Sequence, residues 1–119
     1  MGELMYKLSY AEIMESDCRT SRAREQEALD RAIELMRLAE SKGTPSPEAN
    51  EAIQYVQKLW SFFIQNLTDP NNELADGLKD DLIAIGLWAI AEADRILAEQ
   101  SKSFGPLINI NTAIRDGLS

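Results

Sequence analysis

Histidine is absent from this 119-residue chain, and cysteine occurs once, at Cys18. Histidine is the commonest general base and the commonest transition-metal ligand, and a single thiol builds neither a zinc site nor a redox pair. The six glycines are scattered rather than gathered in a phosphate-binding loop. These absences disfavour an enzyme, a metalloprotein and a nucleotide-binding protein, so we expect no catalytic residue, metal or cofactor.

Long apolar runs are missing as well. A membrane-spanning helix needs about 20 successive apolar residues, and no segment reaches that length. The first residues lack the charged and then apolar plan of a signal peptide, and Tyr6 stands where an N-myristoylation pattern requires serine or threonine. The lone Cys18 excludes an internal disulfide, which fits a reducing compartment. We therefore expect a cytoplasmic protein with no membrane contact.

Basic residues are outnumbered. The chain has 12 lysines and arginines against 20 aspartates and glutamates, which gives a formal net charge of −8. Nucleic-acid binding draws most of its affinity from neutralised phosphates, so this chain starts from repulsion. The candidate basic patch, formed by Arg19, Arg22 and Arg24, is followed directly by Glu25. Direct contact with RNA or DNA is therefore disfavoured, and these arginines are the place where it would have to occur.

Apolar residues, in contrast, are sufficient for one folded domain, because 45% of the chain is hydrophobic. A domain of this size buries roughly two thirds of its unfolded surface and needs no disulfide or metal. Apolar side chains recur at spacings of three and four, the period of an amphipathic helix, and no strand pattern or repeat occurs. We predict an all-α protein, a compact antiparallel bundle of about four main helices with an N-terminal arm.

The turn residues divide the chain into segments. We expect an arm at residues 1–18, with a short helix over about 9–16, and then a single helical domain at residues 19–119. Four long helices are predicted, at about residues 20–41, 47–67, 75–101 and 105–117. Gly43 supplies a stop after the first, and Ser46 with Pro47 supplies the start of the second. The third is apolar almost all round, which is typical of a central helix, so we predict that the bundle packs around it.

Three aromatic side chains lie away from the centre of the apolar stripes. Tyr55 and Phe62 are seven residues apart, so they share a helix face on the flank of the second stripe, and Trp88 lies on the reverse face of the third helix. Each has two interpretations: a place in the core, which we favour, or an exposed patch that marks a partner site. The arm, with Tyr6 and Tyr10, has the apolar surface to cover such a patch.

Asn111 stands in the middle of the apolar face of the last helix, among Leu107, Ile108 and Ile114. An apolar residue is expected at this position. Asn111 is either a buried amide whose hydrogen bonds fix the register of the helix, which we favour, or a polar contact in a groove.

Several stretches, spread in order over nearly the whole chain, are similar to one known family. They are Tyr6–Glu12 (YKLSYAE), Ala28–Leu35 (ALDRAIEL), Leu59-Trp60 with Asn66-Leu67 and Asn72, Leu82–Trp88 (LIAIGLW) and Ile114–Leu118 (IRDGL). The IGLW run and the closing RDGL run are the more specific pair. Through these residues the chain resembles the flagellar biosynthesis regulatory protein FlaF family, whose members begin near the Met5-Tyr6 pair of this sequence.

The resemblance implies a role in flagellum assembly. It implies that the chain binds flagellin in the manner of a secretion chaperone, supports flagellin synthesis after transcription, and works alongside the regulator FlbT, which is associated with flagellin mRNA. The alternative is a translational regulator that acts on this mRNA directly or through FlbT. No active-site residue is implied. Flagellin exposes amphipathic terminal helices that need an apolar groove, and the candidate partner-binding residues are Tyr6, Tyr10, Tyr55, Phe62 and Trp88.

Overall fold

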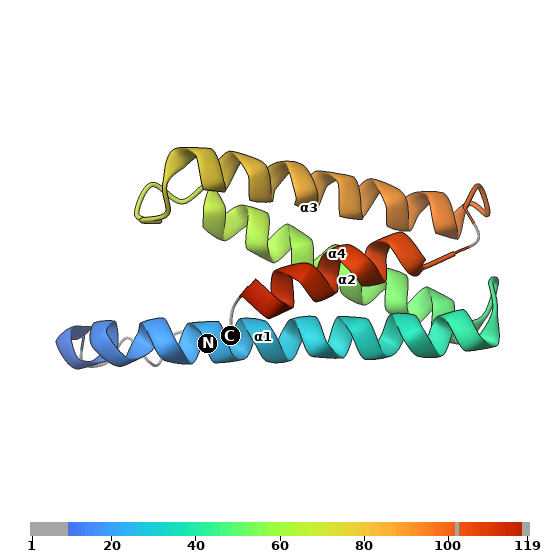
Figure 1. Cartoon of the computed structure of the whole chain (residues 1–119), viewed down its shortest axis with the longest axis horizontal. Coiled ribbons are helices and arrows are strands. Elements are labelled where there is room, and N and C mark those ends of the chain that lie inside the picture. The colour runs from blue at the N-terminus through green and yellow to red at the C-terminus, as the bar shows by residue number, and fades with distance from the viewer. Residues whose placement is uncertain (1–9, 102, 118–119) are drawn as a thin grey trace.

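The computed structural model describes the backbone of residues 10–101 and 103–117, and the side chains from residue 22 onward within these ranges. The described residues form no strand and four helices, α1 (Tyr10–Lys42), α2 (Pro47–Leu67), α3 (Asp76–Leu97) and α4 (Gly105–Gly117). Successive helices run in opposite directions (Figure 1). The prediction of an all-α antiparallel bundle is confirmed.

α1 is one helix of 33 residues, where the sequence analysis expected a short helix and then a separate long one. That expectation is wrong, because residues 17–20 contain neither glycine nor proline, and nothing else interrupts the backbone there. The division into an arm at residues 1–18 and a domain at residues 19–119 stays a prediction, although α1 runs through this boundary.

The turn between α1 and α2 has the predicted chemistry. Gly43 adopts a positive φ of 85°, which other residues rarely adopt, and its N–H donates to the carbonyl of Ala39 at 2.9 Å. The Oγ of Ser46 accepts from the N–H of Ala49 at 3.0 Å. Ser46 is therefore the N-cap of α2, and Pro47 is its first residue.

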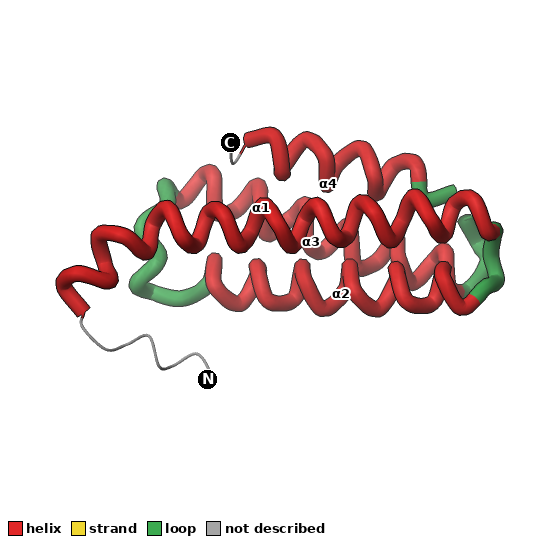
Figure 2. Tube along the Cα trace, turned by 90° about the horizontal axis from the view of Figure 1, so that it is seen from below, coloured by secondary structure: helices red, strands yellow, loops and turns green. Residues whose placement is uncertain are grey.

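The central helix of the bundle is α2 rather than α3. α2 packs along both α1 and α3, and α4 packs on α1, whereas α3 and α4 barely touch. Figure 2 shows α2 and α4 on either side of α1, with α3 behind. Arg115 of α4 pairs with Asp30 of α1 at 3.3 Å, and Glu40 of α1 accepts the N–H of Phe104 at 2.7 Å. Because these contacts hold α4 on α1, the prediction that α3 is central is wrong.

One hydrophobic core joins the helices, and Trp60 of α2 lies within it, 1% exposed. Its Nε1 donates to the Oδ1 of Asn111 at 2.9 Å, and the Nδ2 of Asn111 donates to the carbonyl of Leu107 at 2.7 Å. Asn111 is therefore a buried amide that links α4 to α2, and the favoured interpretation is confirmed. The other large and fully buried side chains are Leu29, Met36, Ile53, Val56, Ile96, Phe104 and Leu107.

α3 lies close to α2 because Gly86 has no side chain. A Cβ atom at this position would lie 2.9 Å from the Cδ1 of Ile64 and 2.9 Å from the ring of Trp60. Further along the same interface, the Nε2 of Gln57 donates to the carbonyl of Ile90 at 3.1 Å and to the Oδ1 of Asp94 at 2.8 Å. These contacts fix which face of α3 is turned inward.

Candidate functional site

The helices differ in length, and this leaves one end of the bundle incomplete. α4 has 13 residues, whereas α2 has 21, α3 has 22 and α1 has 33. At a rise of about 1.5 Å per residue, α4 is too short to follow α1 and α3 along their whole length. In Figure 1, α4 ends about halfway along α1, so it does not reach the start of α3, and only α2 lies behind this part of the bundle.

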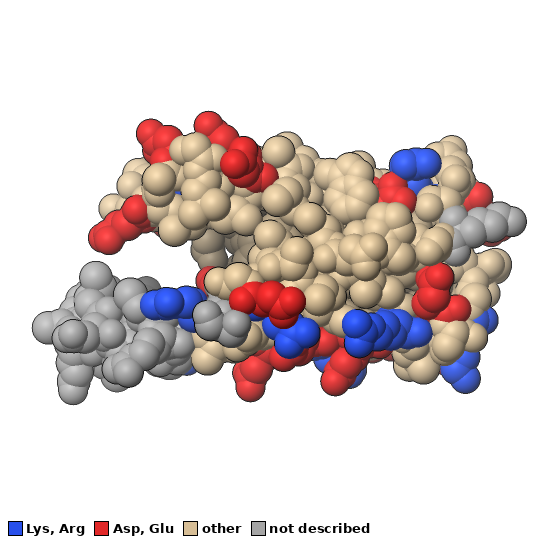
Figure 3. Space-filling model, in the orientation of Figure 1, with Lys and Arg blue, Asp and Glu red and all other residues tan. Residues whose placement is uncertain are grey.

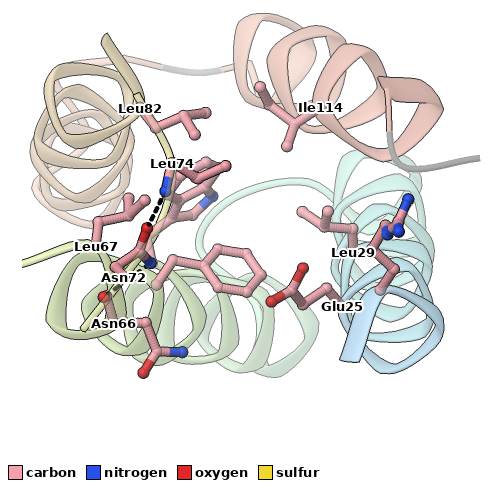
Figure 4. Close-up of a pocket in the computed structure, with 11 residues that line it drawn as sticks. Glu25, Leu29, Asn66, Leu67, Asn72, Leu74, Leu82 and Ile114 are labelled. Atoms are coloured by element: carbon pink, nitrogen blue, oxygen red, sulfur yellow. Dashed lines mark hydrogen bonds between the residues drawn. The ribbon is translucent and has the colours of Figure 1, made fainter. Parts of the chain in front are cut away.

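A groove of about 450 Å³ opens at this incomplete end, and Figure 3 shows the surface hollowed there. In Figure 4 its floor is α2, α1 forms one side, the start of α3 forms the other, and Ile114 of α4 closes one end. We call it the end groove. Its apolar lining residues are Leu29, Trp60, Phe63, Leu67, Leu74, Leu82 and Ile114.

Among the described residues that line the end groove, Glu25 is the one carboxylate, and its side chain points into the groove from α1 (Figure 4). Burial raises the pKa of the Glu25 carboxyl above its usual value, and the positive charge of Arg22 opposes this shift. A partly desolvated carboxylate gains from any hydrogen-bond donor that an occupant brings. The groove therefore combines an apolar lining with one strong acceptor.

The turn from α2 to α3 forms a wall of the groove and is held by Asn72. The Nδ2 of Asn72 donates to the carbonyl of Asn66 at 3.1 Å, and its Oδ1 accepts from the N–H of Leu74 at 3.0 Å (Figure 4). The Nζ of Lys79 donates to the carbonyl of Asn72 at 3.3 Å. These bonds place Leu74 at the groove. The family resemblance includes Asn66 and Asn72, but nothing local in the sequence indicates these hydrogen bonds.

A second apolar surface lies on the outer side of α3. Leu87 and Trp88 are 58% and 41% exposed, and the exposed Ala84 and Ala91 flank them at helical spacing. We call these four residues the outer seam. No charged residue occurs at 82–91 or at 103–114, and Figure 3 shows an uncharged band over α3 and α4. A shallow depression beside Trp88 is lined by Ile85, Pro106, Asn109 and Ile110.

Two of the three aromatic residues singled out in the sequence are exposed. The favoured core positions are wrong for Trp88 and for Phe62, which is 55% exposed, whereas Tyr55 is partly buried and packs against the core as favoured. Trp88 stays exposed because α4 lies on α1 and does not cover this side of α3. Phe62 lies among glutamines and Lys58 on the outer face of α2.

The structure does not bring the five candidate partner-binding residues together in one site. Phe62 and Trp88 lie in separate depressions on different helices. Tyr6 falls outside the described residues, and Tyr10 is the first residue of α1 with a side chain outside the described set. Their role in binding stays a prediction. The end groove was missed, because it is formed by residues from every helix and only the fold assembles it.

Glu92, the buried charged residue in the described part of the chain, has hydrogen-bond partners within the chain. Glu92 is 6% exposed, and its carboxylate accepts from the Nη1 of Arg95 at 2.9 Å and from the Oγ of Ser101 at 3.1 Å. Within residues 22–101 and 103–117, no three acidic, cysteine or histidine side chains gather as a metal site would require. In the same part of the chain, no helix has the length and apolar character needed to cross a membrane.

Comparison with known families shows to which family the chain belongs. The family model of the flagellar protein FlaF matches residues 6–118, a range that includes all of the described structure, with both the end groove and the outer seam. No match to the chain was found among curated proteins or among solved structures. The chain therefore belongs to the FlaF family of flagellar proteins.

Proposed function

We propose that this flagellar protein binds flagellin in the cytoplasm in the manner of a secretion chaperone, and that the end groove receives one of flagellin's amphipathic terminal helices. Membership of the FlaF family supports a flagellar role. The single observation that carries the binding proposal is the end groove itself, an apolar groove at the place where the bundle lacks part of its fourth helix. Recognition of an amphipathic helix by such a groove is a recurrent mode of peptide binding.

A helix bound in line with α4 would complete the bundle. Its apolar face would meet Leu29 of α1, Phe63 of α2 and Leu82 of α3, three residues that line the groove. Each large apolar side chain that the helix buries contributes about 1.5–3 kcal/mol. A lysine, arginine or glutamine on the same helix, near its edge, would donate to Glu25. The expected ligand is therefore an amphipathic helix with a donor beside its apolar stripe.

Support of flagellin synthesis would then follow from holding flagellin, with or without FlbT. Direct contact with flagellin mRNA is the less favoured alternative. Of its three candidate arginines, Arg22 lines the end groove and offsets the charge of Glu25, and Arg24 has an interaction within the chain. The net charge of −8 also opposes it. We propose no catalytic activity.

Titration of purified flagellin against a pair of leucine variants tests the proposal. Leu74 lines the end groove and is 42% exposed, whereas Leu78 is 47% exposed and does not line it. Leu74→Asp should weaken binding by about tenfold or more, because it places a charge in the apolar groove. Leu78→Asp should leave affinity within about twofold. Flagellin without its terminal helices should not bind.

Three results would contradict the proposal that flagellin binds in the end groove. Absence of binding to full-length flagellin would refute the proposed function. Equal affinities of the Leu74→Asp and Leu78→Asp variants would show that flagellin binds away from the end groove. A loss of binding in Phe62→Asp or Trp88→Asp alone, with a native circular dichroism spectrum, would move the site to the exposed aromatic residues predicted from the sequence.

A further inference from the structure

We propose that the outer seam of α3 is the interface of a symmetric dimer, and that its occupant is a second copy of this chain. The seam differs from the end groove in shape, because it is the exposed face of one helix rather than a hollow between several. Its residues are Ala84, Leu87, Trp88 and Ala91, at positions i, i+3, i+4 and i+7 of the helix. This is the spacing at which one helix packs along another.

The seam is complementary to itself when two copies of α3 run antiparallel. With a two-fold axis through its middle, Leu87 of one copy faces Trp88 of the other, and Ala84 faces Ala91. Large side chains then meet at the centre and small ones at both ends, so the two helices approach closely along their length. Such an isologous arrangement is the commonest in protein oligomers, and antiparallel helix dipoles also attract.

The charges at the two ends of the seam favour the antiparallel direction. The exposed Asp80 and Asp81 lie at its N-terminal end, and Arg95 lies at its C-terminal end with a side chain that is 55% exposed. In this antiparallel register Asp80 of each copy faces Arg95 of the other, so the contact between opposite charges forms twice. Parallel pairing would place like charges together.

Two other charged groups near this end of α3, Asp94 and Glu92, have partners within the chain. Asp94 accepts a hydrogen bond from Gln57 of α2 at 2.8 Å. Arg95 donates to Glu92 at 2.9 Å, but a guanidinium has five N–H donors, so it can contact Glu92 and a second carboxylate at once. Arg95 can therefore pair with the acidic end of a second copy while it remains bonded to Glu92.

α4 extends the interface beyond a single helix. The depression beside Trp88 continues the uncharged surface onto Pro106 and Ile110. A stable interface buries about 800 Å² on each partner, which is roughly a tenth of the 7450 Å² surface of the chain. The exposed surface of α3 together with that of α4 can supply this area. Leu74 and Leu82, which line the end groove, lie outside the seam. The dimer therefore leaves both end grooves open and does not depend on flagellin binding.

Sedimentation velocity between about 1 and 100 µM tests the dimer. The wild-type chain should reach twice its 13.3 kDa mass. Leu87→Glu should weaken self-association by more than about tenfold, because it buries charges at the centre of the interface. Leu97→Glu is the matched control, because Leu97 is 54% exposed on the same helix but outside the seam. A monomer at 100 µM, or equal effects of the two variants, would overturn the proposal.

Charge reversal tests the direction of the helices. Asp80→Lys should weaken the dimer severalfold, because a lysine then faces Arg95 of the other copy at each end of the seam. Adding Arg95→Glu to the same chain should restore association. Circular dichroism and urea unfolding of each variant establish that the monomer remains folded. If the double variant is folded and stays as weak as the Asp80→Lys variant, the antiparallel arrangement is wrong.

Discussion

α2 and α3 have similar lengths and wide apolar faces, yet they are buried to different degrees. α2 carries glutamines and Lys58 on its outer face and lies between two neighbours, α1 and α3. α3 has no charged residue from 82 to 91, yet within the described part of the chain its only extensive contact is with α2, so Leu87 and Trp88 remain exposed. Apolar character alone does not place a helix at the centre of a bundle. An apolar face left on an outer helix instead indicates a partner.

The two tryptophans give the largest expected contrast between these helices. Trp60→Ala in α2 should lower the free energy of unfolding by about 3–5 kcal/mol, because it removes a side chain that is 1% exposed and leaves a cavity. Trp88→Ala in α3 should change it by less than about 1 kcal/mol. Urea unfolding followed by circular dichroism, at concentrations where the chain is monomeric, measures both. Equal losses would contradict the assignment of α2 as the central helix.

The link between α2 and α4 should come next in size. Asn111→Ala removes the acceptor of the Trp60 Nε1 hydrogen bond and leaves a buried donor unpaired, which costs about 1–3 kcal/mol. Asn109→Ala, on the exposed side of the same helix, should change stability by less than about 0.5 kcal/mol. Thermal or urea unfolding separates the two variants. If Asn109→Ala is the more destabilising change, the interior of α4 is misassigned.

The close approach of α3 to α2 predicts a smaller effect. Gly86→Ala places a methyl group 2.9 Å from the ring of Trp60. Overpacking of this kind costs about 1–3 kcal/mol, and the better helix propensity of alanine offsets up to about 1 kcal/mol, so a net loss of about 1–2 kcal/mol is expected. Gly77→Ala, with no atom within 4 Å of the new Cβ, should be neutral or slightly stabilising. A stabilised Gly86→Ala variant would show that the interface is loose.

The smallest expected effect on stability comes from Glu25, whose carboxyl faces the apolar lining of the end groove. The outer face of α2 has no such apolar lining. Burial raises the pKa of Glu25 in the folded chain above 4.5, its value when unperturbed in the unfolded chain. Between the unfolded and the folded pKa, the folded chain therefore binds more protons than the unfolded chain. The contribution of Glu25 to stability therefore decreases as the pH rises through this window. Glu25→Gln should remove that decrease. Urea unfolding of both proteins at several pH values gives the difference, and parallel curves would contradict a buried carboxyl.

Local chemistry explains which features followed from the sequence alone. The start of α2 at Ser46 and Pro47, the stop at Gly43 and the bounds of α4 were predicted, because capping bonds and turn conformations are completed within one or two turns of the helix. Asn111 was predicted as a buried amide, because a polar residue within an apolar stripe has few other ways to be satisfied.

The sequence by itself determined that the chain is all-helical, where most of its helices begin and end, which side of each is apolar, and to which family it belongs. Only the tertiary structure decided that α2 is central, that Trp88 is exposed and that an end groove exists. The physical reason is that these features depend on where α4 lies. Contacts such as Glu40 with Phe104, 64 residues apart in the chain, hold α4 on α1, and helical periodicity carries no information about which neighbour covers an apolar face.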